Sequence, residues 1–280
     1  MLIKINYKFK NKSINELLEF YHLSKANIYK LKINKALTVN GDFVEFDYIL
    51  KENDEINIDL EYTEDIYTEE SKKDIDVLYE DDDFIIIKKP RGILIHSDGN
   101  DYDTLCNRLA YYYNRNYIKS SVRVVHRIDV DTTGMVIFPK HLLSASYLSY
   151  LFENEMVEKN YQCWVKGNFV EKTGVINSAI GKDRHSNKQR ISKTGKPAYT
   201  EYKVIEEKKG KTKLQVLIKG GRRHQIRVHL SSINHPILGD KIYGEESKES
   251  LKLHFYNIKF IHPRTLDLFN FSCEDIDKIK

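Results

Sequence analysis

A strongly acidic segment divides this chain into two parts with different sequence patterns. From Glu61 to Asp83 there are eleven Asp and Glu residues and only two Lys residues. The first part of this segment, EYTEDIYTEESKKDID, has little apolar periodicity and so offers no face to a hydrophobic core. We therefore predict a small module over residues 1–62, an acidic linker over 63–76 and a larger domain over 77–280.

Basic residues concentrate beyond the acidic segment. Residues 1–60 hold nine Lys or Arg and nine Asp or Glu, whereas residues 84–280 hold 34 basic and 21 acidic residues, a net charge of +13. A basic surface of this kind suits a polyanion, and nucleic acid is one such partner. On charge alone, a solvated basic surface is the alternative.

The composition excludes several classes of protein. The chain has 280 residues, of which 41% are hydrophobic, enough for a packed core and too many for a disordered chain. The start, MLIKINYKFK, lacks the apolar run of a signal peptide, and no stretch approaches the roughly 20 apolar residues of a membrane helix. Cys106, Cys163 and Cys273 are widely spaced and odd in number, so they indicate neither a disulfide framework nor a zinc site. We expect a cytoplasmic protein without membrane contact.

The first 60 residues show the pattern of a small α/β module. Ile14, Leu17, Leu18 and Tyr21 form the stripe of a short amphipathic helix, and Ser24 is placed to cap a second helix that runs through residue 32. The segment ALTVNGDFVEF carries Asn-Gly between two alternating runs, a strong hairpin signal, and EINIDL alternates as a closing strand.

The larger part mixes strands and helices. Apolar or alternating runs predict strands over residues 84–90, 134–140, 161–165, 198–205 and 213–219, and the 3.6-residue period predicts helices over 142–156 and 224–233. The strands do not follow a regular βαβ order. We therefore predict an α+β fold, with a mixed, mainly antiparallel sheet flanked by helices.

One polar turn concentrates groups that can do chemistry. The segment VVHRIDVDTTGMVIF places His126, Arg127, Asp129 and Asp131 between two predicted strands. Such a cluster is typical of a functional site. From this segment alone, an Asx-type turn in which an aspartate caps backbone amides is equally consistent.

A second segment, GGRRHQIRVHL, supplies arginines. Arg223 and Arg227 lie four residues apart, which places them on one face of the predicted helix, and the preceding glycines allow the backbone to approach a ligand closely. An arginine beside an aspartate keeps the carboxylate ionised and oriented. The two segments together favour a site over a structural turn.

These motifs resemble those of a known enzyme family. HRIDVDTTG resembles the H-R-L-D-x-x-T-S-G motif of the RluA-type RNA pseudouridine synthases, and GRRHQIRVHLSSINHPILGDKIYG resembles their G-R-T-H-Q-I-R-V-H-L and H-P-I-x-G-D-x-x-Y-G block. VLYEDDDFIIIKKPRGILIH, the K-x-Y at residues 159–161, GKPAYTEY and LHFYNIKFIHP agree in order. The first 60 residues resemble the small αL RNA-binding module that precedes many such synthases.

The resemblance implies a reaction and three catalytic residues. Members of the family isomerise uridine to pseudouridine within RNA, breaking the C1′–N1 bond and joining C5 to C1′, without metal or cofactor. By motif position, Asp129 is the ionised carboxylate at the ribose, Arg227 is its ion-pair partner, and Tyr161 stacks on the target base. Covalent attack by Asp129 and removal of a ribose proton both remain open as its role.

The resemblance and the charge pattern also imply RNA contacts. We expect Arg127 to occupy the place of a flipped-out base and His126 to support the turn. Substrate-binding residues are expected to be Arg127, His126, Arg222, Arg223, His224 and Gln225. Contacts to the RNA backbone are expected from Lys182, Arg184, Lys188, Arg190 and Lys25, for which a solvated surface is the alternative.

The expected partner is structured RNA, with 23S ribosomal RNA as substrate, no metal, and a monomeric state. A transfer RNA synthase of the same family and a non-catalytic RNA-binding or ribosome-assembly protein are the alternatives. A metal-dependent nuclease built on His126, Asp129, His224, His229 and His254 is disfavoured. On a helix, His224 and His229 would lie ~140° apart, too far around it to share an ion.

Overall fold

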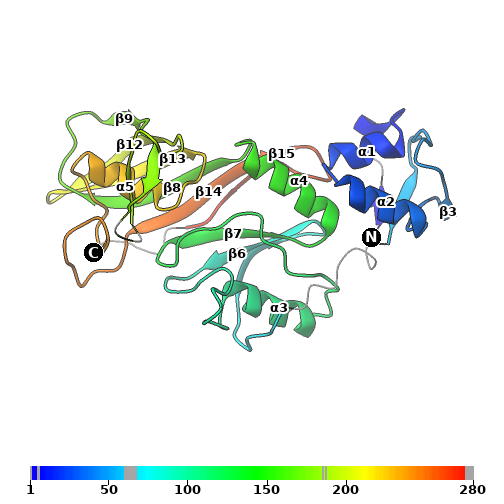
Figure 1. The fold of residues 1–280 in the computed structure, drawn as a ribbon, viewed down its shortest axis with the longest axis horizontal. Helices are drawn as coiled ribbons and strands as arrows, with labels where there is room; N and C mark the ends of the chain where they lie inside the picture. Colours follow the sequence, from blue (N-terminus) through cyan, green and yellow to red (C-terminus); the bar gives the residue numbers. More distant parts are fainter. Residues whose placement is uncertain (1, 5–6, 60–67, 185, 187, 275–280) are drawn as a thin grey trace.

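The computed structural model describes residues 2–4, 7–59, 68–184, 186 and 188–274 (Figure 1). An N-terminal module lies at one end of the elongated molecule, and the larger part extends away from it. Residues 60–67, which include the first part of the predicted linker, lie outside the described residues. No described helix has the length and apolar character needed to cross a bilayer.

The N-terminal module pairs two helices with a small antiparallel sheet. It contains β1 (Leu2–Lys4), the 3-10 turn η1 (Tyr7–Phe9), α1 (Ile14–Phe20), α2 (Lys25–Ile33), β2 (Leu37–Val39), β3 (Asp42–Phe43) and β4 (Glu55–Ile58), with strand order β1-β4-β2-β3. Ser24 caps α2 by accepting the N–H of Asn27. Asn40 and Gly41 both have positive φ, as a tight hairpin turn requires. The predicted helices and hairpin are confirmed.

The larger part is built on a nine-stranded sheet. Its strands are β5 (Asp76–Glu80), β6 (Phe84–Lys89), β7 (Thr133–Pro139), β8 (Glu158–Lys166), β9 (Thr173–Ile176), β12 (Tyr199–Lys208), β13 (Lys211–Lys219), β14 (Leu253–Ile261) and β15 (Leu268–Ser272). The order is β5-β6-β7-β14-β8-β13-β12-β9, and β15 also pairs with β14. The β7–β14 pair is parallel and the other pairs in this sheet are antiparallel, so the predicted mixed, mainly antiparallel α+β fold is confirmed.

Three helices and a separate hairpin complete the larger part. The helices are α3 (Leu105–Arg115), α4 (Leu142–Glu153) and α5 (Gln225–Ser232). The two-stranded hairpin consists of β10 (Ile180–Lys182) and β11 (Gln189–Ile191). Residues 180–191 carry Lys182, Arg184, Lys188 and Arg190, and we call them the basic hairpin.

Strands β7 and β14 approach each other only at one point. Their register joins His254 and Phe255 to Thr133 and Gly134. A Cβ at Gly134 would lie 2.3 Å from the carbonyl oxygen of Phe255, and Gly134 has a φ of 119°, so the close approach requires glycine. Beyond this point β14 pairs with β15, and the two strands separate. This junction places the start of β7 opposite the middle of β8, with β14 between the two strands.

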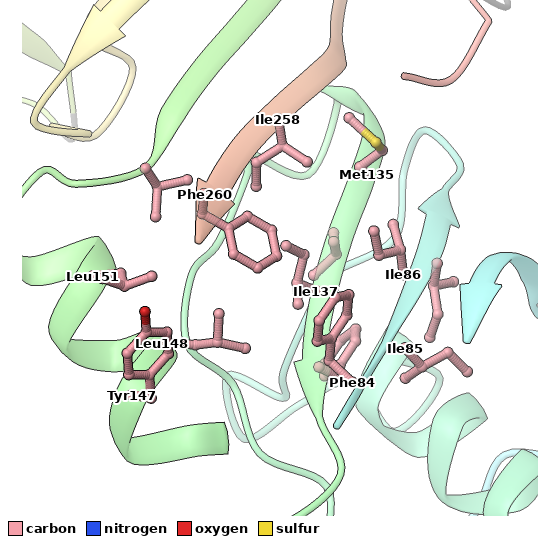
Figure 2. Close-up of a cluster of buried hydrophobic side chains, with 14 of the residues drawn as sticks. Phe84, Ile85, Ile86, Met135, Ile137, Tyr147, Leu148, Leu151, Ile258 and Phe260 are labelled. Atoms are coloured by element: carbon pink, nitrogen blue, oxygen red, sulfur yellow. The ribbon is translucent and has the colours of Figure 1, made fainter. Parts of the chain in front are cut away.

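The core of the larger part surrounds β7, all seven residues of which are buried. Figure 2 shows Ile137 of β7 among side chains from β6, α4 and β14, including Phe84, Leu148 and Phe260. Because β7 has the sheet on both sides and α4 across one face, it is apolar without alternation. The sequence FIIIKKP behaves similarly in β6.

Two expectations about local structure are wrong in detail. Val124 and Val125, expected to end a strand before the polar turn, lie in no strand. β7 already has β6 on one side, and on the other side the N–H of Ile137 is taken by the imidazole of His126 instead of by a strand. Arg223 lies before α5 and not on it, because His224 turns the backbone into the left-handed region with a φ of 58°.

The described part of the acidic segment contacts the larger domain. The side chain of Asn107 in α3 donates to the carbonyl of Glu69, and the hydroxyl of Ser71 donates to Asp103. Strand β5 begins at Asp76, the last residue assigned to the linker. Polar contacts with α3 and the residues before it therefore hold the described end of the acidic segment, which lacks apolar periodicity.

Aromatic contacts join the N-terminal module to the larger part. The ring of His22 stacks on Tyr150 of α4 with centroids 3.4 Å apart, and Phe20 packs against Tyr147. The Tyr21 hydroxyl donates to the carbonyl of Pro263 at 3.0 Å. Apolar residues of both parts form one continuous cluster.

We predict that Ile137→Ala lowers the free energy of unfolding by about 2–5 kcal/mol, because it opens a cavity beside β7. Ile205→Ala is the control. Its side chain is 48% exposed, so a change within about 0.5 kcal/mol is expected. Urea unfolding followed by circular dichroism measures both values. Equal effects of the two substitutions would contradict the placement of β7 in the core.

Candidate active site

The loop that contains Asp129 is held in place from beneath by two buried groups. The Nε2 atom of His126 accepts the N–H of Ile137 at 3.0 Å, and its ring stacks on Phe152. Burial, with a contribution from Lys159, lowers the pKa of His126 to about 3, so the ring is neutral. His126 therefore supports the loop, as predicted for it, and its accepting nitrogen is engaged by the backbone.

Lys89 is the second support, and the sequence pattern did not single it out. Its side chain is fully buried, and the ammonium donates to the carbonyls of Pro90, Ile93 and Val130 at 2.7–2.9 Å. Val130 follows Asp129 directly. Burial lowers the pKa of Lys89 to about 8, against the opposing effect of the nearby aspartates 129 and 131. A lysine at the end of a strand that is otherwise apolar was the available signal.

Arg227 connects Asp129 to a second carboxylate. Its guanidinium makes two hydrogen bonds of 2.8 Å to Asp240, and its Nη1 atom lies 3.4 Å from Oδ2 of Asp129. Arg227 is 4% exposed. Burial alone would lower the pKa of Arg227, but the two carboxylates outweigh it and raise this pKa above its usual value. The cation is therefore fixed, and Asp129 faces a permanent positive charge.

Asp240 belongs to the support of the site. Besides Arg227, it accepts the N–H groups of Ile242 and Tyr243. The Arg227 guanidinium and, to a lesser extent, these two backbone bonds hold the pKa of Asp240 below its usual range, despite the opposing effect of burial. Asp240 lies in the matched block HPILGDKIYG, but only the structure shows that it is the principal partner of Arg227.

Tyr161 and Asp129 line the same cleft. Tyr161 is 7% exposed and stacks on Phe255 with ring centroids 4.6 Å apart. Burial and the Asp129 charge raise the pKa of Tyr161 above its usual range, so the hydroxyl is protonated. The cleft is lined by Arg127, Ile128, Asp129, Thr132, Tyr161, Ile218, Gly221, Arg222, His224, Gln225, Ile226, Arg227 and Leu253.

Two side chains fix the turn between β13 and α5. The Lys159 ammonium donates to the Gly220 carbonyl at 2.6 Å, and the Gln225 side-chain oxygen accepts the N–H groups of Gly221 and Arg222. The Gln225 amide nitrogen is bonded to Tyr199, Thr200 and Lys219. Gln225 is thus used within the protein, although it was expected to bind substrate.

The other residues expected to contact RNA differ in how far they are buried. His224 is buried, with Nδ1 2.8 Å from the Tyr243 hydroxyl and Nε2 3.9 Å from Asp129. Arg127 and Arg223 are exposed, and Arg222 is half-buried with its Nε bonded to the Pro197 carbonyl. The residues expected at the RNA backbone are all exposed: Lys182, Arg184, Lys188 and Arg190 on the basic hairpin, and Lys25 at the start of α2.

The histidines considered for a nuclease site are engaged elsewhere. His229 contacts the Thr200 hydroxyl and the Ser178 carbonyl, and His254 contacts the Thr133 hydroxyl. Among the described residues, the group with metal-ligand spacing is Asp81, Asp83 and His262, outside the cleft. There Asp83 is bonded to His141 and Arg264, and Asp81 to His262, Tyr79 and backbone amides.

The comparisons with known families agree with this geometry. A family model described as RNA pseudouridylate synthase matches residues 83–232, which include Asp129, Tyr161 and Arg227. This chain belongs to the RNA pseudouridylate synthase family. A second model, the RluD ribosomal pseudouridine synthase N-terminal domain, matches residues 1–56. The activity class is therefore isomerisation of uridine to pseudouridine in RNA, and the resemblance drawn from the motifs is confirmed.

Individual relatives cover most of the chain. An uncharacterized RNA pseudouridine synthase of Bacillus subtilis, YhcT, is 36% identical over 88% of this chain and 83% of its own length. Ribosomal large subunit pseudouridine synthase D of Yersinia pestis is 32% identical over 84% of this chain and 72% of its own length. Human RNA pseudouridylate synthase domain containing 1 shares the fold, with a TM-score of 0.63 and 23% identity over 73% of this chain and 85% of that one.

We predict that Asp240→Asn lowers the free energy of unfolding of this synthase by about 3 kcal/mol, because it leaves the buried Arg227 charge without its main counterion. The control is Glu245→Gln, which breaks an exposed ion pair with Lys166 and is expected to cost under about 1 kcal/mol. Thermal and urea unfolding measure both. A cost for Asp240→Asn no larger than that of the control would show that Arg227 does not need Asp240.

Proposed function

We propose that this chain isomerises specific uridines of structured RNA, and that its substrate is 23S ribosomal RNA. The observation that carries the proposal is the Asp129 carboxylate, 3.4 Å from the buried Arg227 and in the same cleft as Tyr161. Several curated relatives carry the name ribosomal large subunit pseudouridine synthase D, which supports the RNA class. A bacterial-type ribosomal substrate places the protein in the cytoplasm.

Asp129 is the catalytic residue in this proposal. The reaction breaks the C1′–N1 bond, turns the uracil, joins C5 to C1′, and exchanges the proton on C5 for one on N1. Attack on C1′ and removal of a ribose proton both need an ionised carboxylate beside the sugar. Arg227 orients the carboxylate of Asp129, and its own position is fixed by Asp240.

Tyr161 packs against the uracil in this proposal. Its ring is already held parallel to Phe255, with an interplanar angle of 14°, so stacking on a base requires no reorientation. Because the hydroxyl is protonated, it assists loss of the C5 proton by passing its own proton to water as it receives the C5 proton. Arg127, exposed at the cleft, fills the space of the flipped nucleotide.

RNA outside the cleft is bound by basic groups on two parts of the chain. We assign phosphate contacts to the exposed cations of the basic hairpin, and to Lys25 in the N-terminal module. Residues 1–62 act as the RNA-binding module and 77–280 as the catalytic domain, joined by the acidic segment. Its negative charge keeps RNA off the connection between them.

We predict that Asp129→Asn abolishes tritium release from ribosomal RNA labelled at uracil C5, while RNA affinity changes little. Isomerisation must expel this hydrogen. The matched control is Asp131→Asn, an exposed carboxylate two residues away, whose rate should stay within about 3-fold of the unsubstituted protein. Transfer RNA transcripts run in parallel, and release from these alone would move the assignment to transfer RNA. Release by Asp129→Asn would overturn the catalytic assignment.

We predict that Tyr161→Phe slows tritium release by about 10²-fold or more, as loss of a group that moves a proton does. The phenyl ring preserves the stacking on Phe255, so RNA affinity and thermal stability should not change. The comparison uses the same labelled RNA under single-turnover conditions. An unchanged rate would limit Tyr161 to stacking.

A further inference from the structure

The basic hairpin packs directly on the helix that carries Arg227. A small apolar cluster lies apart from the main core. It consists of Ile180 at the start of the hairpin, Ala198 before β12, and Val228 of α5, and Tyr243 packs against it. Val228 follows Arg227 in the chain. The surface expected to meet RNA and the buried arginine of the site therefore share one turn of α5.

One hydroxyl group bonds to both the hairpin and the site. The Tyr243 oxygen accepts the backbone N–H of Gln189, the first residue of β11, at 2.8 Å. The same oxygen lies 2.8 Å from Nδ1 of His224. The other ring nitrogen of His224 lies 3.9 Å from the Asp129 carboxylate. A continuous series of contacts thus runs from the hairpin backbone to Asp129.

The first of these hydrogen bonds has a fixed direction, and the direction of the second depends on the His224 tautomer. The Gln189 N–H can only donate, so the Tyr243 oxygen accepts it and the Tyr243 O–H is available to donate to His224. Burial lowers the pKa of His224 despite the opposing charge of Asp129, which favours a neutral ring. A ring that accepts at Nδ1 carries its proton on Nε2, directed toward Asp129.

Tyr243 also contacts Arg227 and Asp240, the two residues that support the Asp129 carboxylate. The Arg227 guanidinium lies over its ring, 5.3 Å from the centroid. Its backbone N–H donates to Asp240 at 3.1 Å. Tyr243 is therefore in contact with Arg227, Asp240 and His224 at once, and with the hairpin on its other side.

We propose that Tyr243 is a positioning residue that couples the basic hairpin to Asp129, so that RNA contacts made by the hairpin accelerate the chemical step as well as strengthening binding. When phosphates hold the hairpin, the Gln189 N–H fixes the Tyr243 hydroxyl, and through His224 the carboxylate is held against Arg227. The coupling rests on the proposed catalytic role of Asp129.

The test is a double-mutant cycle between Tyr243→Phe and the hairpin pair Lys188→Gln with Arg190→Gln. Phenylalanine keeps the ring over Arg227 and removes only the hydroxyl. Single-turnover tritium release at saturating RNA gives the rate of the chemical step, and filter binding gives the Kd. We expect Tyr243→Phe, which removes the hydrogen bonds to Gln189 and His224, to slow release about 10-fold with unchanged Kd.

With Tyr243 present, the hairpin pair should slow release about 10-fold and weaken RNA binding. In the Tyr243→Phe background, the pair should weaken binding equally but slow release by less than a further factor of about 2. The matched control removes two exposed lysines away from the hairpin, Lys208→Gln with Lys209→Gln, and should leave the rate unchanged in both backgrounds. Multiplicative rate effects of Tyr243→Phe and the hairpin pair would overturn the coupling while leaving the proposed function intact. Absence of tritium release from the unsubstituted protein would overturn both.

Discussion

The buried guanidinium of Arg227 imposes the main constraint on this molecule. A cation that is 4% exposed must have its charge balanced and its donors bonded, and the chain does this with Asp240 from the segment after α5 and Asp129 from the loop before β7. Both carboxylates must converge on the Arg227 guanidinium. This requirement fixes the positions of α5, the turn after it and the Asp129 loop relative to each other. The cleft is the space left between these elements.

Buried polar groups, rather than regular structure, hold the backbone around the cleft. Lys89 gathers three carbonyls beneath the Asp129 loop, His126 takes a strand N–H, and Lys159 and Gln225 pin the turn before α5. Each satisfies backbone groups that no strand or helix satisfies there. This explains how the loops that line part of the cleft keep a defined shape beside the strand residues Tyr161, Ile218 and Leu253, which line the rest of it together with α5.

The sequence was sufficient for elements with a clear period or cap, and it singled out Asp129, Tyr161 and Arg227, which line one cleft in the structure. It failed where distant segments compete for one partner. Val124 and Val125 resemble the end of a strand, but the side chain of His126 takes the N–H of Ile137 instead. Arg223 has helical spacing to Arg227, but the left-handed backbone of His224 separates it from the helix. The roles of Lys89 and Asp240 depend on contacts across 41 and 13 residues, which no local pattern contains.

The junction at Gly134 has a consequence for how variation can act on this enzyme. Since even a methyl group there would meet the Phe255 carbonyl at 2.3 Å, the two halves of the sheet are held in register at the point where the backbones of β7 and β14 pair. Phe255 in turn carries the ring of Tyr161, and β7 follows the Asp129 loop. One backbone-to-backbone contact therefore sets both walls of the cleft, and a residue larger than glycine at position 134 would shift Asp129 and Tyr161 relative to each other.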